Sequence, residues 1–333
     1  MSNRDVIFVD IKTPEDFLKV AGLLSSEQWI YRGHGDAKWT LRPTLERLND
    51  ARHNVLEKKQ KNEKRTIIQH YLKMQLNNST TTPKEEYIAV QLFKARAHCK
   101  EISDIEALCR MQHFGAPTRL LDFTFSIYVA LYFAFEERYS QKDRCIWAIR
   151  YDILKSRVSS TWDKYYRERG IKPRDIINAT DEERDRLSNE YYEDMLSDAF
   201  VFNNACVEIA NKQIKDSPIS TSQSDIIPLE LPGENERIDA QNGLFLFPTT
   251  FKSFEENLCK SLGLNDNPLK KGDIHYYSVV KFSQAWHAWN QPAIVKMVFK
   301  HKDMDSAESL LRMSNVSTRS IYPGVEGIAK SIW

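Results

Sequence analysis

Apolar and polar positions alternate along this chain with spacings typical of both strands and helices. Short apolar runs bounded by glycine, proline or charged residues are typical of buried strands. One such run, Trp29-Ile30-Tyr31, ends in Arg32, where a charge is costly unless it is paired or holds a ligand. The pattern predicts strands at residues 29–32, 117–123, 144–151, 243–248 and 293–301.

Helix starts are marked by proline directly after a capping residue. Thr13 and Pro14 predict a helix over 13–24, and Thr82 to Glu85 predict a second start of the same kind. Gly115 ends another helical pattern. Helices are therefore expected at 13–24, 51–76, from 82 onwards, 104–114, 126–139 and 302–313, with a short one at the C-terminus.

Strand-like and helical segments interleave without the regular spacing of a doubly wound sheet. This order predicts an α+β fold, with a mixed or antiparallel sheet as the core and helices at its periphery. We expect a single domain over residues 1–333. A basic helical insertion is expected at about 50–100, and a polar helical insertion at about 152–235.

Composition favours a reduced cytoplasmic protein. The 333 residues have a formal net charge of +1 and 41% hydrophobic content, which is ordinary for a globular chain. No run is long and apolar enough to span a membrane, and the first residues lack a signal-peptide pattern. The five cysteines are odd in number and form no Cys-x-x-Cys pair, so neither a disulfide framework nor a zinc site is expected.

The near-neutral charge conceals an asymmetry along the chain. Residues 36–100 carry 14 Lys and Arg against 7 Asp and Glu, whereas residues 181–240 carry 5 against 15. A basic segment of this kind attracts nucleic acid, faces an acidic partner, or is simply a solvated helix face. The solvated face is the commoner of these cases.

Polar side chains capable of binding a ligand gather in three places beside predicted strands. Convergence of such strand ends is how pockets are usually built, so we expect the three clusters to form one site. Each residue alone also has a structural interpretation: Arg32 and Asp122 as an ion pair, or Arg119 as a helix cap. The clusters are Tyr31, Arg32, Gly33, His34 and Gly35; Gln112, His113, Thr118, Arg119, Asp122 and Thr124; and Glu236, Arg237, Asp239 and Gln241.

Several common enzyme motifs are missing. The sequence has no G-x-G-x-x-G, no G-x-x-x-x-G-K-[ST], no H-E-x-x-H and no G-x-S-x-G. Phosphoryl transfer on a P-loop, zinc hydrolysis and α/β-hydrolase chemistry are therefore disfavoured, and no metal is expected.

The clusters resemble the motifs of the FRG domain family. IYRGH (30–34) resembles the family's [FY]-R-G signature, and QHFGAPTRLLDFTFSIYVALYFA (112–134) resembles its most specific stretch. RIDAQNGLFLF (237–247) and YPGVEGIAK (322–330) resemble its later patterns, so the resemblance frames residues 30–330. Departures are small: Tyr31 stands where Phe gives the family its name, and Phe123 where Trp is common.

A weaker likeness connects the same segments to the Arg-Ser-Glu class of ADP-ribosyltransferases. In those folds an arginine strand, a Ser/Thr strand leading into an apolar helix, and a Glu or Gln strand follow in this order. This likeness implies NAD as substrate, with Arg32 on its pyrophosphate and Gly33 and Gly35 leaving room for it. Thr124 would line the nicotinamide pocket, and Asp122 would orient Arg32 or Arg119. Gln241 would stabilise the oxocarbenium-like state, with Glu236 and Glu326 in reserve.

Three functions stay open from the sequence. The first is an NAD-dependent ADP-ribosyltransferase, which by resemblance acts as a toxin or phage-defence effector silenced by an inhibitory or chaperone-like partner. Its target would be RNA, DNA or protein, and the basic segment 51–76 suits a nucleic acid. The second is a non-catalytic nucleotide or nucleic-acid binding module. The third is a Mg²⁺-dependent nuclease using Asp122, Glu236 and Glu326.

Overall fold

The structure is a computed structural model of the chain. It describes residues 6–25, 28–63, 69, 81–137, 140–168, 199–215, 225–230, 236–264, 269, 275–286, 292–301 and 307–332. Parts of four expected segments lie outside the described residues. These parts are 64–68 and 70–76 of the helix 51–76, 138–139 of the helix 126–139, 302–306 of the helix 302–313, and 169–198, 216–224 and 231–235 of the polar insertion.

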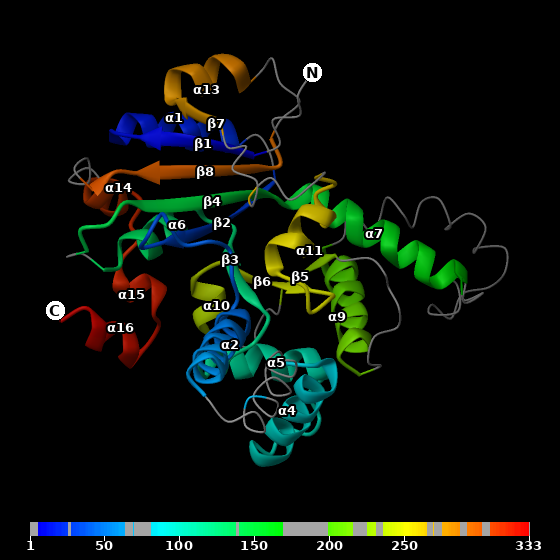
Figure 1. Cartoon of the computed structure of the whole chain (residues 1–333). Helices are drawn as coiled ribbons and strands as arrows, with labels where there is room; N and C mark the ends of the chain where they lie inside the picture. Colours follow the sequence, from blue (N-terminus) through cyan, green and yellow to red (C-terminus); the bar gives the residue numbers. More distant parts are fainter. Residues whose placement is uncertain are drawn as a thin grey trace, which may run out of the picture.

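A mixed eight-stranded sheet forms the centre of the described fold, in the order β5-β6-β3-β2-β4-β8-β1-β7 (Figure 1). β1 runs parallel to both β7 and β8, and the other neighbouring strands are antiparallel. The expected α+β class with a mixed sheet is thus confirmed. The strands are β1 (Val6–Ile11), β2 (Trp29–His34), β3 (Leu121–Thr124), β4 (Arg144–Arg150), β5 (Ile226–Leu229), β6 (Gly243–Pro248), β7 (His275–Ser278) and β8 (Ile294–Phe299).

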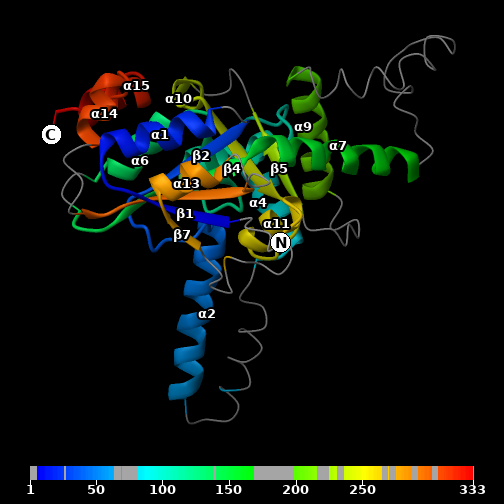
Figure 2. The ribbon, with the colours of Figure 1, turned by 90° about the horizontal axis from the view of Figure 1, so that it is seen from above.

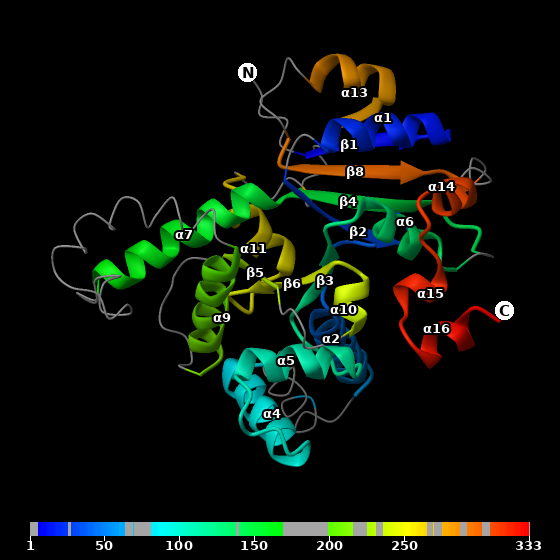
Figure 3. The same cartoon turned by 180° about the vertical axis from the view of Figure 1, so that it is seen from behind.

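The helices cover both faces of this sheet. In Figure 1, α13 and α1 lie at the β7 end, and α4 and α5 lie at the opposite end. From behind, α15 and α16 are seen beside α10 (Figure 3). The helices are α1 (Pro14–Leu24), α2 (Thr44–Asn62), α4 (Pro83–Arg96), α5 (Asp104–His113), α6 (Ile127–Phe135), α7 (Tyr151–Glu168), α9 (Ala199–Lys215), α10 (Glu236–Ala240), α11 (Phe254–Ser261), α13 (Val279–Trp286), α14 (Ala307–Met313), α15 (Thr318–Ile321) and α16 (Val325–Lys330).

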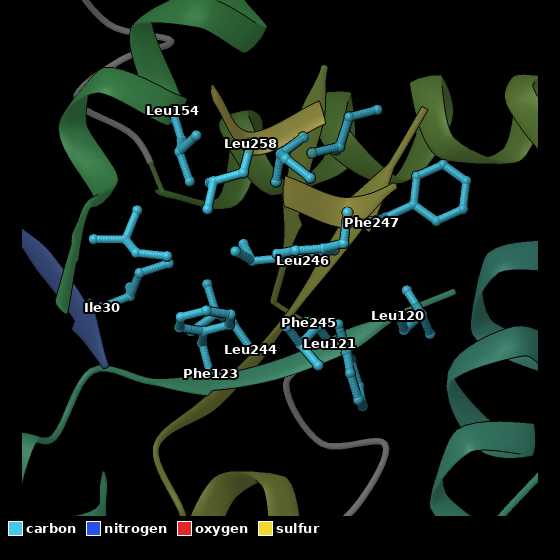
Figure 4. Close-up of a cluster of buried hydrophobic side chains, with 14 of the residues drawn as sticks. Ile30, Leu120, Leu121, Phe123, Leu154, Leu244, Phe245, Leu246, Phe247 and Leu258 are labelled. Carbon is cyan, nitrogen blue, oxygen red and sulfur yellow. The ribbon is translucent and has the colours of Figure 1, made fainter. Parts of the chain in front are cut away.

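Alternate side chains of the central strands pack into two separate hydrophobic cores, one on each face of the sheet. In β1, Ile7 and Val9 pack with α1, α6 and α13, whereas Phe8 packs in the core that contains α4, α5, α7, α9 and α11. This two-sided burial follows from the two-residue period of a strand. The core that contains Phe8 also includes apolar residues of the run 243–248. Figure 4 shows Leu244, Leu246 and Phe247 within it.

The capping signals in the sequence are confirmed. Thr13 accepts a hydrogen bond from the backbone N–H of Asp16, and Pro14 begins α1. Thr82 and Glu85 form a capping box at the start of α4, with Thr82 N–H 2.8 Å from Glu85 Oε2. Gly115 follows α5 with a φ of +82°, a left-handed conformation that favours glycine.

Three sequence-based boundaries are corrected. The basic helix starts earlier than expected, at Thr44, and ends at Asn62 because Glu63 has an extended backbone. β3 begins at Leu121 and not at 117, because the Thr118 hydroxyl accepts a hydrogen bond from the backbone N–H of Leu120 in a local turn. The region 152–235 also contributes β5 to the sheet; Pro228 is tolerated there because β5 is an edge strand.

Candidate functional site

The sheet divides at one residue pair. β2 and β3 are paired only through Tyr31 and Thr124. Beyond this pair, β2 continues beside β4 up to His34, whereas β3 runs beside β6. The strands therefore diverge, and a pocket of about 620 Å³ lies at this division. Its size falls within the range of small-molecule sites.

The pocket brings the three predicted clusters together. The convergence expected from the sequence is thus found: the first cluster lines the pocket with all of its members, and the other two with some of theirs. Nine of the residues singled out above as catalytic or cofactor-binding line the pocket: Tyr31, Arg32, Gly33, His34, Gln112, His113, Asp122, Thr124 and Gln241.

Arg32 bridges the gap between the diverging strands. Its Nη1 donates to the backbone oxygen of Asp122 at 2.6 Å and lies 3.6 Å from that residue's carboxylate. Its Nε donates to His34 Nε2 at 3.1 Å. Nη2 makes no hydrogen bond to any described residue, and the side chain is 24% exposed. The guanidinium is thus fixed at two nitrogens, and the third, Nη2, has no hydrogen-bond partner among the described residues.

His34 acts as an acceptor for Arg32 and is held neutral. Burial, together with the neighbouring charges of Arg32, Lys296 and Arg47, lowers its pKa from 6.5 to about 3, against a raising effect of the Trp39 backbone. A neutral imidazole has one nitrogen free to accept, which matches the Arg32 Nε–H bond. Burial likewise lowers the pKa of Arg32, and Asp122 opposes this shift.

A chain of hydrogen bonds supports the Asp122 side of the pocket. Gln112 Nε2 donates to the Asp122 carboxylate at 3.1 Å, and Gln112 Oε1 accepts from the Thr118 hydroxyl. Thr118 is itself buried and does not line the pocket. Asp122 therefore orients Arg32, as one of the two expectations stated, and Thr118 and Gln112 orient Asp122.

Thr124 and Gln241 connect β3 to the residue that follows α10. The Thr124 hydroxyl donates to the Gln241 backbone oxygen at 2.7 Å and accepts from Ser126 N–H at 3.0 Å. The Gln241 side chain donates to the Ile321 backbone oxygen at 3.2 Å. Both residues line the pocket, and both have polar atoms engaged in holding its wall.

Gly33 lines the pocket and also allows α6 to pack closely on β2. A Cβ at Gly33 would lie 1.9 Å from the backbone oxygen of Ala130 and 2.7 Å from the nitrogen of Ala134, both in α6. β2 and α6 can pack this closely only if the residue has no side chain. The missing side chain at Gly33 thus has a packing role, and the expectation that it also makes room for a dinucleotide stays a prediction. At Gly35 a Cβ would meet nothing closer than 4.0 Å.

Besides Thr118, three predicted site residues lie outside the pocket lining. Arg119 is buried, pairs with Glu86 at 2.7–2.9 Å and donates to the Pro248 backbone oxygen at 2.8 Å. Its guanidinium also stacks on Phe247 at 4.1 Å, so it holds the core together and is not available to a cofactor. Glu236 and Glu326 are not among the lining residues.

Glu326 lies one layer behind the pocket. It is 3.7 Å from Arg237, which does line the pocket, and 3.3 Å from Lys330. The guanidinium of Arg237 lies over the Tyr322 ring at 4.7 Å. The C-terminal segment thus supports Arg237 without itself reaching the pocket.

The structure adds charged residues that the sequence motifs did not indicate. Lys38, Arg42 and Arg47 line the pocket from the segment after β2, while Glu136 and Glu137 line it from the end of α6. Glu136 accepts a hydrogen bond from the Tyr322 hydroxyl at 2.6 Å. The excess of basic residues between 36 and 100 was the available signal for the cationic wall. No local motif marked the two glutamates.

The fold and the pocket define a mixed-sheet protein with a cationic site where its sheet divides. Residues 27–143 match the family model of the FRG domain, so this segment of the chain is similar to that family. The match includes the Arg32 and Asp122 clusters and ends before the Gln241 cluster. No curated protein and no solved structure matches the chain.

Two further features of the described residues bear on the open functions. No helix in the described ranges has the length and apolar character to cross a membrane. Within the same ranges, no group of three or more His, Cys, Asp or Glu side chains is placed to hold a metal ion. Of the three carboxylates considered for a nuclease, Asp122 lines the pocket, whereas Glu236 and Glu326 do not.

Proposed function

We propose that the pocket binds NAD and that the protein transfers its ADP-ribose to a cellular macromolecule. The observation that carries this proposal is the state of Arg32. Its guanidinium is fixed by His34 and by the Asp122 backbone, and Nη2 is left without a partner among the described residues. A fixed guanidinium with an available N–H is suited to a phosphate oxygen of a pyrophosphate.

The charges around Arg32 support a dianionic ligand. Lys38, Arg42, Arg47 and Arg237 line the same pocket, against the carboxylates of Asp122, Glu136 and Glu137. Arg42 is neutralised by hydrogen bonds to Glu46 and Asp50, which belong to the helix that it precedes. A ligand phosphate placed beside Arg32 would still face an excess of positive charge.

In the proposed reaction, the bond between ribose C1′ and the nicotinamide nitrogen breaks. The electron pair stays on nicotinamide, which leaves as a neutral molecule. An oxygen or nitrogen of the acceptor forms the new bond to C1′ and releases its proton to a base. Glu136 and Glu137 join Gln241 as candidates for stabilising the ribose cation and accepting that proton, because all three line the pocket.

The test is NAD binding and nicotinamide release by the purified protein and its Arg32→Ala and Arg32→Lys variants. Loss of a charge-assisted hydrogen bond of about 1.5–3 kcal/mol should weaken NAD binding by about 10- to 150-fold in Arg32→Ala. Arg32→Lys keeps the positive charge but not the several N–H donors of the planar guanidinium, so its loss of NAD affinity should be intermediate. Arg312→Ala, in an exposed pair with Glu308 on α14, is the matched control and should bind like the native protein.

The outcomes separate the two leading functions. NAD binding with nicotinamide release supports the transferase. Binding that depends on Arg32 without any nicotinamide release supports the non-catalytic module. That module has one observation in its favour, since the Thr124 hydroxyl and the nitrogen of the Gln241 amide are already engaged within the protein. An Arg32→Ala variant that is folded and binds NAD normally would remove Arg32 from the site.

A further inference from the structure

An exposed tryptophan stands at the edge of the pocket. Trp39 lines the pocket and is 48% exposed, which is unusual for so large an apolar side chain. Lys142 Nζ lies 5.6 Å from its ring centre, and the His34 ring approaches it at 6.0 Å with an interplanar angle of 67°. These neighbours leave about half of the indole available to a flat partner.

The segment that carries Trp39 is held firmly. The backbone N–H of Ala37 donates to Asp143 O at 2.7 Å, and the Ala37 oxygen accepts from Lys296 Nζ at 2.7 Å. Lys296 reaches it from β8 as a buried cation, 4.4 Å from the centre of the Trp147 ring. Asp36 closes the turn, accepting from Lys38 N–H through its carboxylate and from Trp39 N–H through its backbone. An exposed aromatic on a fixed backbone loses little entropy when it stacks on a ligand.

Positive charge continues from Trp39 beyond the pocket. Lys38 is exposed, makes no ion pair with a described residue, and lines the pocket together with the exposed Arg47 of α2. Lys58 lies eleven residues after Arg47 and therefore on the same side of the helix, about 17 Å further along. Lys58 is also exposed and without an ion pair to a described residue.

Helix α2 presents these charges away from the body of the protein. Of its 19 residues only Leu45 is buried, and Figure 2 shows the helix extending away from the sheet. The line from Trp39 through Arg47 to Lys58 is longer than one nucleotide. A flat aromatic surface followed by a line of cations is the arrangement by which proteins bind single-stranded nucleic acid.

We infer that the acceptor in the proposed transfer is a single-stranded nucleic acid, with one base stacked on Trp39 and its phosphates on Lys38, Arg47 and Lys58. The role of the strand as an acceptor rests on the proposed function, whereas its binding to this surface does not depend on NAD. An unpaired strand is required because a base within a duplex has no free face for the indole. RNA and DNA share this chemistry, and the experiment distinguishes them.

The experiment measures fluorescence anisotropy of labelled oligouridine and oligothymidine of about 12 nucleotides, and of a duplex of the same length. Single strands should bind more tightly than the duplex. Trp39→Ala should weaken single-strand binding by about 5- to 150-fold, and Trp39→Phe should restore most of it, since stacking on an aromatic ring is sequence-tolerant. Tyr276→Ala on β7, an aromatic at the far edge of the sheet that is more exposed than Trp39, is the control and should have no effect.

Salt dependence tests the cationic line. Three phosphate contacts predict that log K falls with log salt with a slope of about −2, and Lys58→Ala should reduce the slope by about 0.7. Lys281→Ala on α13 serves as the charge control. No binding of either single strand at low salt, or full binding by Trp39→Ala, would overturn the inference.

NAD binding, measured on the same variants, separates this inference from the proposed function. A native protein that binds single strands but not NAD contradicts the transferase and leaves the strand-binding surface in place. A native protein that binds NAD but no single strand contradicts the inference alone and points to a protein acceptor. Equal loss of NAD and oligonucleotide binding in Trp39→Ala would make Trp39 part of the NAD site and would also overturn the inference.

Discussion

Mild acid should destabilise this protein through His34. The folded chain keeps this imidazole neutral, because it is buried beside Arg32 and its pKa is lowered from 6.5 to about 3. The unfolded chain exposes it, so its pKa returns to the ordinary value of about 6.5. Between these two values the unfolded state binds a proton that the folded state does not. Stability from His34 is therefore complete above pH 6.5 and is lost progressively as the pH falls toward 3.

The magnitude follows from the two pKa values. The free energy of unfolding should fall by up to about 1.4 kcal/mol per pH unit in this range. Between pH 7.5 and pH 5 the loss assigned to His34 is about 2 kcal/mol. This is a large fraction of a typical domain stability of about 5–15 kcal/mol. A 6% exposed side chain has little solvent screening to reduce it.

The assay compares urea unfolding of the native protein and His34→Gln at pH 7.5 and pH 5. Glutamine keeps an acceptor for Arg32 Nε–H but does not titrate. His34→Gln is expected to be the less stable protein at pH 7.5, and the difference between the two proteins should shrink by about 2 kcal/mol at pH 5. Parallel pH dependences would refute the reasoning. So would an NMR titration in which the ring signal missing from His34→Gln, one of eight histidines, titrates near 6.5.

Two further predictions concern stability and are checked by the same unfolding measurement. Gly33→Ala should lower the free energy of unfolding by about 3 kcal/mol or more, because its methyl group would lie 1.9 Å from the backbone oxygen of Ala130. Gly35→Ala should lower it by less than about 1 kcal/mol. Equal losses in the two variants would contradict the packing argument. Glu86→Ala should lower the free energy of unfolding by about 3–5 kcal/mol, because it leaves the buried Arg119 without its carboxylate. Glu308→Ala, which breaks an exposed pair, should lower it by under about 1 kcal/mol. A small effect of Glu86→Ala would mean that water solvates Arg119 in the variant.

Local features of the fold could be predicted from the sequence, because their causes lie within a few residues. The caps at Thr13 and Thr82 and the stop at Gly115 each depend on one turn of chain. The strand at 243–248 follows from an apolar run with a glycine at its start. β1 and β7 were not predicted, although β1 is itself a strongly apolar run. Their parallel pairing joins segments about 270 residues apart, and no local sequence pattern predicts such a pairing.

The candidate site was predictable as a meeting of clusters but not residue by residue. Arg32 and Asp122 could be paired from their strand-end positions, and the structure pairs them. Arg119 looks equally suited in the sequence, three residues before Asp122. It enters the core because Glu86, from a helix that precedes it by some thirty residues, is buried at the position that its guanidinium reaches. Which of two nearby arginines faces the pocket is decided by such distant partners.

The divided sheet and the proposed ligand together would give Arg32 two tasks that compete for the same group. Its Nη1 connects β2 to β3 where the backbones no longer pair, and its Nε bonds to His34 of the same strand, so the guanidinium contributes to holding the pocket open. Nη2 is the nitrogen that remains for a ligand. A lysine has a single nitrogen and cannot do both, which makes Arg32→Lys informative beyond the alanine variant. If it keeps the fold but loses the ligand, the ammonium has taken the structural position beside Asp122. If it keeps the ligand but loses stability, the ammonium has turned to the pocket, and the division between β2 and β3 is left without its bridge.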